Sequence, residues 1–295
     1  MNGLATIFGV FAFCTGAVIA SFLNVVIWRV PRGESIVRPG SHCPKCGAAI
    51  RWYQNVPIIS WLALRGRCAV CGEPISPRYV LVELLGGALF LAAFLKLWTP
   101  HAPLWVSVIH LLILWTWIAL MIVGSMIDFD HKLLPDFATV GGMALGLAGG
   151  VFLSAATYVL LPAADALRPA AFLGVAAPRF LHPLLSSVAG LGLGLGLLWV
   201  IRCLGSKAFK REAMGMGDVL LMGAVGALFG PLAVMVTLIL ASLAGSAAGL
   251  GLMALAKTRF GRFAEIPFGP CICLGCLAWM FYGRELVGWY MNLWR

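Results

Sequence analysis

Charged side chains are scarce in this sequence. Asp, Glu, Lys and Arg together make up only 11% of its 295 residues, whereas apolar residues make up 61%. The mean hydropathy is +0.97. Because a soluble domain usually carries about 25% charged residues, this composition excludes the soluble globular class and predicts a polytopic membrane protein.

The first apolar run, residues 4–28, lacks the features of a cleaved signal peptide. No basic segment precedes it, and no small-residue cleavage pattern comes before the polar loop that follows. We therefore expect it to be a retained transmembrane helix.

Seven more apolar stretches are candidates for spans, for which a bilayer requires about 17–25 residues each. They lie at 80–98, 104–127, 137–161, 184–204, 218–232, 233–256 and 268–290. The sequence therefore predicts an all-α fold with about eight transmembrane helices, in agreement with the internal hydrogen bonding that lipid demands. The segment 218–232 is short because Gly230-Pro231 interrupts the run, and it could be re-entrant.

Basic residues are unevenly distributed among the loops. If both termini lie outside, 16 of the 21 Lys and Arg residues fall on the inner side and five on the outer side, as the positive-inside rule requires. The net charge of +10 is then explained by orientation and by contact with anionic lipid. Because the basic residues are spread over several loops, we expect no nucleic-acid partner.

A polar insert, residues 29–79, separates the first transmembrane helix (1–28) from the remaining membrane bundle (80–295). It contains two CxxC motifs with 21 residues between them, which are formed by Cys43, Cys46, Cys68 and Cys71. Two such knuckles are typical of a structural zinc site with four thiolate ligands. An insert of about 50 residues is also too small to be stabilised by core burial alone.

The alternatives to zinc are two disulfides or unligated thiols. The predicted topology puts the insert in the reducing cytoplasm, which disfavours disulfides. Gly47 and Gly72 follow the second cysteine of each knuckle and suit the tight turn that a knuckle needs. The other five cysteines lie in apolar runs, where we expect small buried hydrophobic residues.

Acidic residues number only eleven, and four of them are predicted to lie at the same membrane face. Asp128, Asp130 and Asp136 cluster in "GSMIDFDHKLLPD", and Asp218 lies in "MGMGDVLL". A carboxylate inside a bilayer costs about 2.5–3.5 kcal/mol, so acids at span ends are retained where water or function supports them.

Two carboxylates from separate helices can share a proton and act as an acid and a base. An aspartyl protease uses this chemistry: one member takes a proton from water while the other polarises the scissile carbonyl. Gly215 and Gly217 would let a substrate backbone approach the acid closely. The alternative is that Asp136 and Asp218 simply cap helices.

The motifs "ASFLNVVIWRVPRG", paired CxxC, "RYVLVELLGG", "IDFDHKLLPD", "GMGD" and "IPFGP" occur in this order. With them the chain resembles, nearly end to end, the bacterial type IV prepilin peptidases, or leader peptidases, which are aspartyl proteases of the GxGD class. The resemblance implies cleavage of the basic leader of type IV prepilins and type II secretion pseudopilins, after a Gly, at the cytoplasmic face of the bacterial inner membrane. It also implies Asp128 and Asp218 as the catalytic pair, without Asp130 or Asp136.

The same resemblance implies a second activity and its cofactors. Many such enzymes methylate the new N-terminal amine with S-adenosylmethionine, and the tetracysteine insert of the bifunctional members is associated with zinc. The insert has no glycine-rich strand-turn-helix pattern for a methyl donor, so this activity follows from resemblance alone. Glu83 is a candidate contact for the amine or the cofactor, with capping or helix pairing as the alternative.

Two other classes of protein remain as alternatives. A polytopic transporter could use the acids as a proton or cation relay, but the chain shows no clear internal repeat. A membrane scaffold would explain the cysteines but not the paired acids. The segment 155–183 is longer than is usual in the family, and its Pro and Ala content predicts an external loop with a short interfacial helix.

Overall fold

The computed structural model describes residues 3–98, 102–160, 169–172, 175–210, 212, 214–255 and 267–293. The chain forms two compact units, Met1–Ile127 and Asp128–Arg295. Ile266 of the motif "IPFGP" lies outside the described residues. The sequence predicts a different division: a first helix (1–28), an aqueous insert (29–79) and a membrane bundle (80–295). This division into membrane and aqueous segments stays a prediction.

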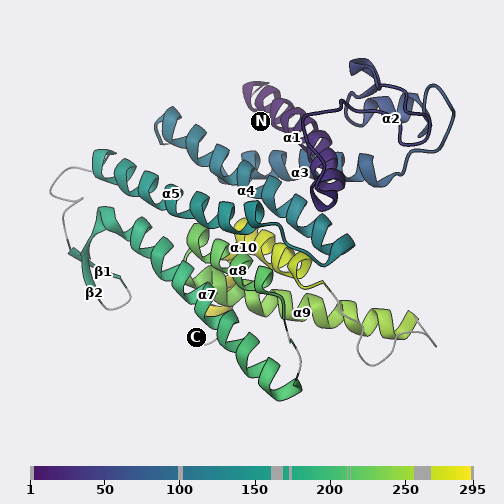
Figure 1. Ribbon diagram of the computed structural model, residues 1–295. Coiled ribbons are helices and arrows are strands. Elements are labelled where there is room, and N and C mark those ends of the chain that lie inside the picture. Colours follow the sequence, from purple (N-terminus) through teal and green to yellow (C-terminus); the bar gives the residue numbers. More distant parts are fainter. Residues whose placement is uncertain are drawn as a thin grey trace. The chain divides into compact units, whose positions relative to one another are not determined.

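In the part of the first unit that the structure describes, three long helices accompany the insert (Figure 1). The long helices are α1 (Gly3–Arg29), α3 (Arg78–Leu97) and α4 (Leu104–His131), the last of which crosses the boundary between the units. The insert holds three short elements: η1 (Val30–Arg32), η2 (Trp52–Gln54) and α2 (Ile59–Ala63).

Small residues allow α1 and α3 to pack closely. A Cβ at Gly16 would come within 2.7 Å of the Phe90 Cβ, and one at Gly87 would come within 2.8 Å of the Phe13 ring. Close approach of helices at small residues is the usual basis of helix association in membranes. On α4, the Trp115 indole stacks on Phe90 with ring centroids 4.9 Å apart and donates a 3.1 Å hydrogen bond to the Phe90 carbonyl.

Among its described residues, the second unit contains five helices and one hairpin. The helices are α5 (Asp136–Leu160), α7 (His182–Phe209), α8 (Met216–Phe229), α9 (Pro231–Leu255) and α10 (Gly269–Asn292). The hairpin pairs β1 (Pro169–Phe172) with β2 (Val175–Pro178) in antiparallel register, Pro169 opposite Pro178, and a turn of 3₁₀ helix, η3 (Arg179–Leu181), leads into α7.

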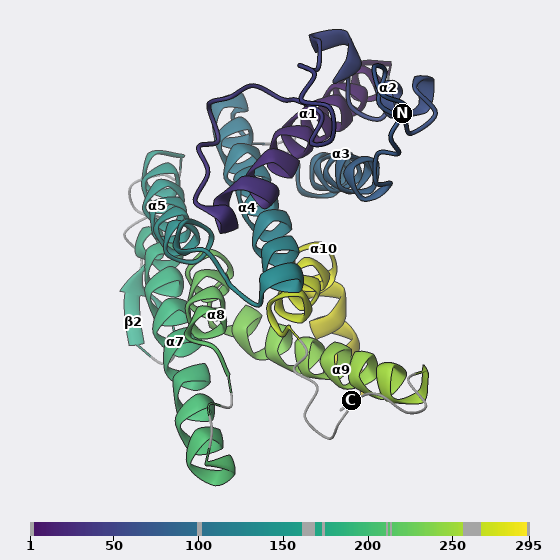
Figure 2. The same cartoon turned by 45° about the vertical axis from the view of Figure 1, so that its right-hand side comes forward.

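Helix α8 is the central element of this unit and contacts all four of the other helices (Figures 1 and 2). Its side chains from Val219 to Ala227 are almost all buried. Glycines make this packing possible: Gly190 of α7 and Gly226 of α8 meet backbone to backbone, with no room for a Cβ on either. Gly230, at φ 84°, ends α8, and Pro231 starts α9, as the conformational preferences of the two residues favour.

The prediction of an all-α membrane fold is confirmed. Among the described residues, seven helices are long and apolar enough to cross a membrane. The predicted sixth span, 218–232, is the 14-residue helix α8, which is shorter than the usual span. Membrane orientation stays a prediction.

The short interfacial helix predicted within 155–183 is not among the residues that the structure describes there, and it stays a prediction. Helix α5 continues to Leu160, and the hairpin β1–β2 follows, while residues 161–168 lie outside the described part. Pro169 and Pro178 flank the paired segment; each proline lacks a backbone N–H and fixes φ, which opposes a continuous helix.

Candidate active site

The four insert cysteines converge on one point. Their sulfur atoms all lie within 4.8 Å of one another, and the Sγ atoms of Cys43 and Cys71 are 3.9 Å apart. A tetrahedral zinc ion with Zn–S bonds of about 2.3 Å separates its sulfur ligands by about 3.8 Å. The cluster therefore fits a zinc ion.

The two knuckles are built by the same hydrogen bonds. In the first, the Cys43 N–H donates to Ala48 and the Gly47 N–H donates to Cys43, both at 2.9 Å. The second knuckle repeats the pattern from Cys68 to Glu73, at 2.8 and 3.0 Å. The turn glycines, Gly47 and Gly72, have φ of 70° and 71°, a left-handed conformation that favours glycine.

Backbone amides prepare two of these thiols for a cation. The backbone N–H groups of Cys71 and Val70 lower the pKa of Cys68 to about 6. Those of Cys46 and Lys45 likewise lower the pKa of Cys43. The pKa of Cys71 rises to about 12: the Glu73 N–H opposes the rise, but desolvation and the neighbouring thiols outweigh it. A central cation would relieve this crowding of thiolates.

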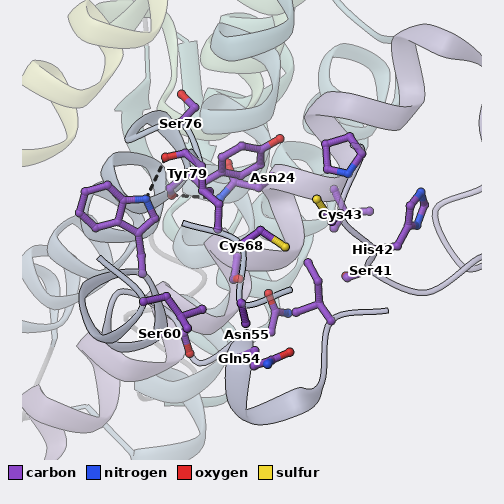
Figure 3. Close-up of a pocket in the computed structure, with 18 of the residues that line it drawn as sticks. Asn24, Ser41, His42, Cys43, Gln54, Asn55, Ser60, Cys68, Ser76 and Tyr79 are labelled. Atoms are coloured by element: carbon purple, nitrogen blue, oxygen red, sulfur yellow. Dashed lines mark hydrogen bonds between the residues drawn. The ribbon is translucent and has the colours of Figure 1, made fainter. Parts of the chain in front are cut away.

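A cavity of about 460 Å³ lies beside the cysteine cluster, within the first unit. Its wall is formed by the second half of α1, the insert and the start of α3. Figure 3 shows Cys43 and Cys68 on this wall, together with Asn24 and Tyr79. The Asn24 amide donates a 3.1 Å hydrogen bond to the Tyr79 carbonyl, which ties α1 to α3 at the cavity.

Glu83 also lines this cavity, and its residue is only 8% exposed. Its Oε2 accepts a 2.7 Å hydrogen bond from the backbone N–H of Ile58. Ile58 directly precedes α2 and has a φ of 63°. Glu83 lies in α3, on the cavity wall, and its carboxylate accepts a hydrogen bond from the backbone just before α2. This partner could not be predicted from the sequence, because the donor is the backbone N–H of Ile58, a residue with an apolar side chain.

The second unit brings two of the four candidate aspartates together. Asp128 lies in the last turn of α4 and Asp218 in the first turn of α8. They are 6% and 8% exposed, and their charges are close enough to interact electrostatically. Asp130 and Asp136 are exposed. The structure therefore separates the predicted pair from the other two acids.

Backbone groups hold both buried carboxylates. The Gly269 N–H, at the start of α10, donates a 3.0 Å hydrogen bond to Asp128 Oδ2, and a Cβ at Gly269 would lie 2.6 Å from that oxygen. The backbone N–H of Gly215 interacts with Asp218. Asp218 is the third residue of α8 and accepts from Gly215, which is the N-cap, so the capping alternative does not hold for Asp218 itself; its carboxylate also interacts electrostatically with Asp128.

Gly215 and Gly217 differ in their surroundings. A Cβ at Gly217 would lie 2.8 Å from the Leu134 Cβ, whereas a Cβ at Gly215 would meet Asp218 Oδ2 at an ordinary 3.7 Å. Packing against the loop after α4 therefore accounts for the glycine at 217. The role of Gly215 in substrate access stays a prediction.

Sequence reasoning gave no role to two residues beside the carboxylates. Gly269 is part of "IPFGP", a motif singled out only for its resemblance. Cys271, interpreted as a small buried hydrophobic residue, is buried, and its thiol interacts electrostatically with both Asp128 and Asp218. The contact from Gly269 to Asp128 is made by a backbone N–H, which has no signal in the sequence.

Two buried, interacting carboxylates in one helical unit and a four-cysteine cluster in the other are typical of a class of membrane-embedded aspartyl proteases. Comparison with known proteins narrows this class. Residues 14–97 match the model of the bacterial peptidase A24 N-terminal domain, and residues 115–250 match the type IV leader peptidase family. The chain belongs to the type IV leader peptidase family.

Curated relatives agree with this family over most of their length. A prepilin leader peptidase/N-methyltransferase of Myxococcus xanthus is 38% identical, with 88% of this chain and 67% of the relative covered. A type 4 prepilin-like proteins leader peptide-processing enzyme of Escherichia coli is 35% identical, with 92% and 93% covered. A prepilin leader peptidase/N-methyltransferase of Aeromonas hydrophila is 33% identical, with 99% and 96% covered. No solved structure is significantly similar to the chain.

Proposed function

We propose that this chain removes the leader of type IV prepilins and type II secretion pseudopilins with Asp128 and Asp218, and then methylates the new N-terminal amine. The observation that carries the proposal is the burial of these two carboxylates within electrostatic reach of each other. The family membership supports the reaction class, and it gives no support to the transporter alternative.

In this mechanism the two aspartates share one proton. The ionised carboxylate takes a proton from a water molecule as the water oxygen forms a bond to the scissile carbonyl carbon. The protonated carboxyl donates to the carbonyl oxygen, and collapse of the tetrahedral intermediate releases the amine, which receives a proton. The Gly269 N–H fixes Asp128 Oδ2, and the first turn of α8 fixes Asp218, so the pair is positioned before substrate binds.

The substrate's apolar helix would lie in the membrane, with its basic leader on the cytoplasmic side of the inner membrane. Because enzyme and substrate are confined to one plane, the scissile bond and the aspartates meet at one depth. The methyl group would come from S-adenosylmethionine, which carries it on a cationic sulfur. Zinc would be held by the four insert cysteines, where it supports the fold of the insert.

A reconstituted reaction tests the proposal. The purified chain in lipid vesicles is incubated with a leader-bearing prepilin, with and without S-adenosylmethionine, and the products are analysed by mass spectrometry. We expect loss of the leader in both samples and the added mass of one methyl group only when the donor is present. An intact prepilin would contradict the proposal, and an unmethylated mature pilin would remove its second activity.

Gly217→Ala should impair leader cleavage much more than Gly215→Ala. The methyl group at 217 would have to displace Leu134, at a cost of about 1–3 kcal/mol, and would shift the turn that carries Asp218. At 215 the new methyl meets ordinary van der Waals distances, and the backbone there, at φ −67° and ψ 151°, suits alanine.

Initial cleavage rates of the two variants in the same membranes, together with their thermal unfolding midpoints, check this expectation. Equal rates for Gly217→Ala and the unmodified chain would show that the contact with Leu134 does not position Asp218.

A further inference from the structure

The cavity is lined by residues of the first unit, whereas Asp128 and Asp218 belong to the second unit. Its volume of about 460 Å³ lies within the range of small-molecule sites, about 300–1,000 Å³. Apolar and aromatic side chains, among them Trp28, Trp61 and Tyr79, share its wall with polar groups. The cavity therefore has the size and composition of a ligand site.

The charge on its wall favours a cation. Glu83 is buried on the wall. Three glutamates line the cavity (Glu34, Glu73 and Glu83) against two basic residues, Arg29 and Lys45, so the lining has one more acidic than basic side chain. Lys45 pairs with Glu73 at 3.2 Å, and Arg29 donates to the carbonyls of Ser35 and Gly40, away from Glu83. A buried carboxylate needs a compensating partner, and a cationic ligand in the cavity would supply one.

The backbone next to Glu83 is strained. A positive φ is rare for a β-branched residue, and Ile58 adopts one at 63°. Such strain is concentrated at functional sites. The hydrogen bond from Ile58 to Glu83 holds the carboxylate in place at this point, which fixes its position on the cavity wall.

We infer that this cavity binds S-adenosylmethionine, with the Glu83 carboxylate facing the cationic sulfonium. The inference rests on the proposed methyl transfer and assigns it a place. When bound, the donor supplies a methyl group to a neutral amine: the nitrogen lone pair forms the C–N bond, the C–S electron pair returns to sulfur, and a nitrogen proton leaves to water. Cys43 and Cys68 line the same cavity, so the metal cluster shapes its wall.

Calorimetry on the full-length chain in detergent can test the role of Glu83. S-adenosylmethionine is compared with S-adenosylhomocysteine, whose sulfur is neutral. Glu83→Gln keeps an oxygen that accepts from Ile58 and removes the charge, so we expect S-adenosylmethionine to bind about tenfold more weakly and S-adenosylhomocysteine to be much less affected. Glu285→Gln, an exposed glutamate on α10 outside the lining, is the matched control and should bind both as the unmodified chain does.

Photolabelling of the unmodified chain tests the place without any variant. S-adenosylmethionine with a labelled methyl group is cross-linked by ultraviolet light, and the labelled peptides are mapped. Label within residues 21–83 supports the site. Label confined to residues 128–295, or no binding at all, overturns it. In the calorimetry, an unchanged preference of Glu83→Gln for S-adenosylmethionine over S-adenosylhomocysteine also overturns it.

The same preparations separate this inference from the proposed function. A chain that cleaves and methylates prepilin but carries label only in the second unit keeps its function and loses this site. A chain that binds the donor in the cavity but leaves prepilin intact keeps the site and loses the proposed cleavage.

Discussion

Asp218→Asn will reduce leader cleavage by about 1,000-fold or more, because amide nitrogen can neither take a proton from water nor share one with Asp128. Asp128→Asn should have a similar effect. Since the two carboxylates act as a unit, the double variant should be no slower than either single variant. Cleavage of a purified prepilin in lipid vesicles, followed over time by gel electrophoresis, measures all three rates.

Asp130→Asn is the matched control, since Asp130 is exposed two residues after Asp128. Its cleavage rate should stay close to that of the unmodified chain. Methylation of a pilin that has already lost its leader should continue in Asp218→Asn, because the proposed mechanism uses the aspartate pair for hydrolysis alone. Full cleavage activity in either Asp128→Asn or Asp218→Asn would show that these two aspartates are not the catalytic pair.

Loss of the metal should unfold the insert and leave the second unit folded. Structural zinc contributes about 10–16 kcal/mol in small zinc domains, and the insert has little core of its own. Cys68→Ser, or treatment with a strong chelator, should therefore abolish methylation and increase amide hydrogen exchange across the two knuckles, while the hydrolytic pair in the other unit continues to cleave.

Metal analysis of the purified chain should find one zinc ion per molecule, and none in Cys68→Ser. Cys203→Ser is the control, because Cys203 lies in α7 and outside the cluster. An unchanged exchange pattern in the metal-free chain would show that the cysteines are not what holds the insert together.

The helices could be predicted from the sequence because each is a continuous apolar run, and the end of α8 because Gly230-Pro231 breaks one. The hairpin at Pro169–Pro178 could not, since its residues are apolar enough for a helix and its pairing depends on contacts between strands. The spacing of the two CxxC motifs was sufficient to predict the cysteine cluster. Asp128 and Asp218 lie 90 positions apart, and the resemblance, rather than any local pattern, paired them.

The hydrogen-bond donors to the site carboxylates could not be predicted from the sequence, for a physical reason. Glu83 is bound by the N–H of Ile58, and Asp128 by the N–H of Gly269. Every residue except proline has such a donor, so its identity reveals nothing about the direction in which the donor points. Only the folded backbone decides that.

The brevity of α8 has a consequence for water. Its 14 residues extend about 21 Å, whereas the hydrocarbon layer is about 30 Å thick. A helix of this length cannot reach both surfaces, and in the described part of the chain it packs against α5, α7, α9 and α10, so water that reaches Asp218 in the proposed mechanism would have to follow a path between these neighbours. Hydrolysis at Asp218 would then depend on how fast that path fills and empties as pilins enter and leave.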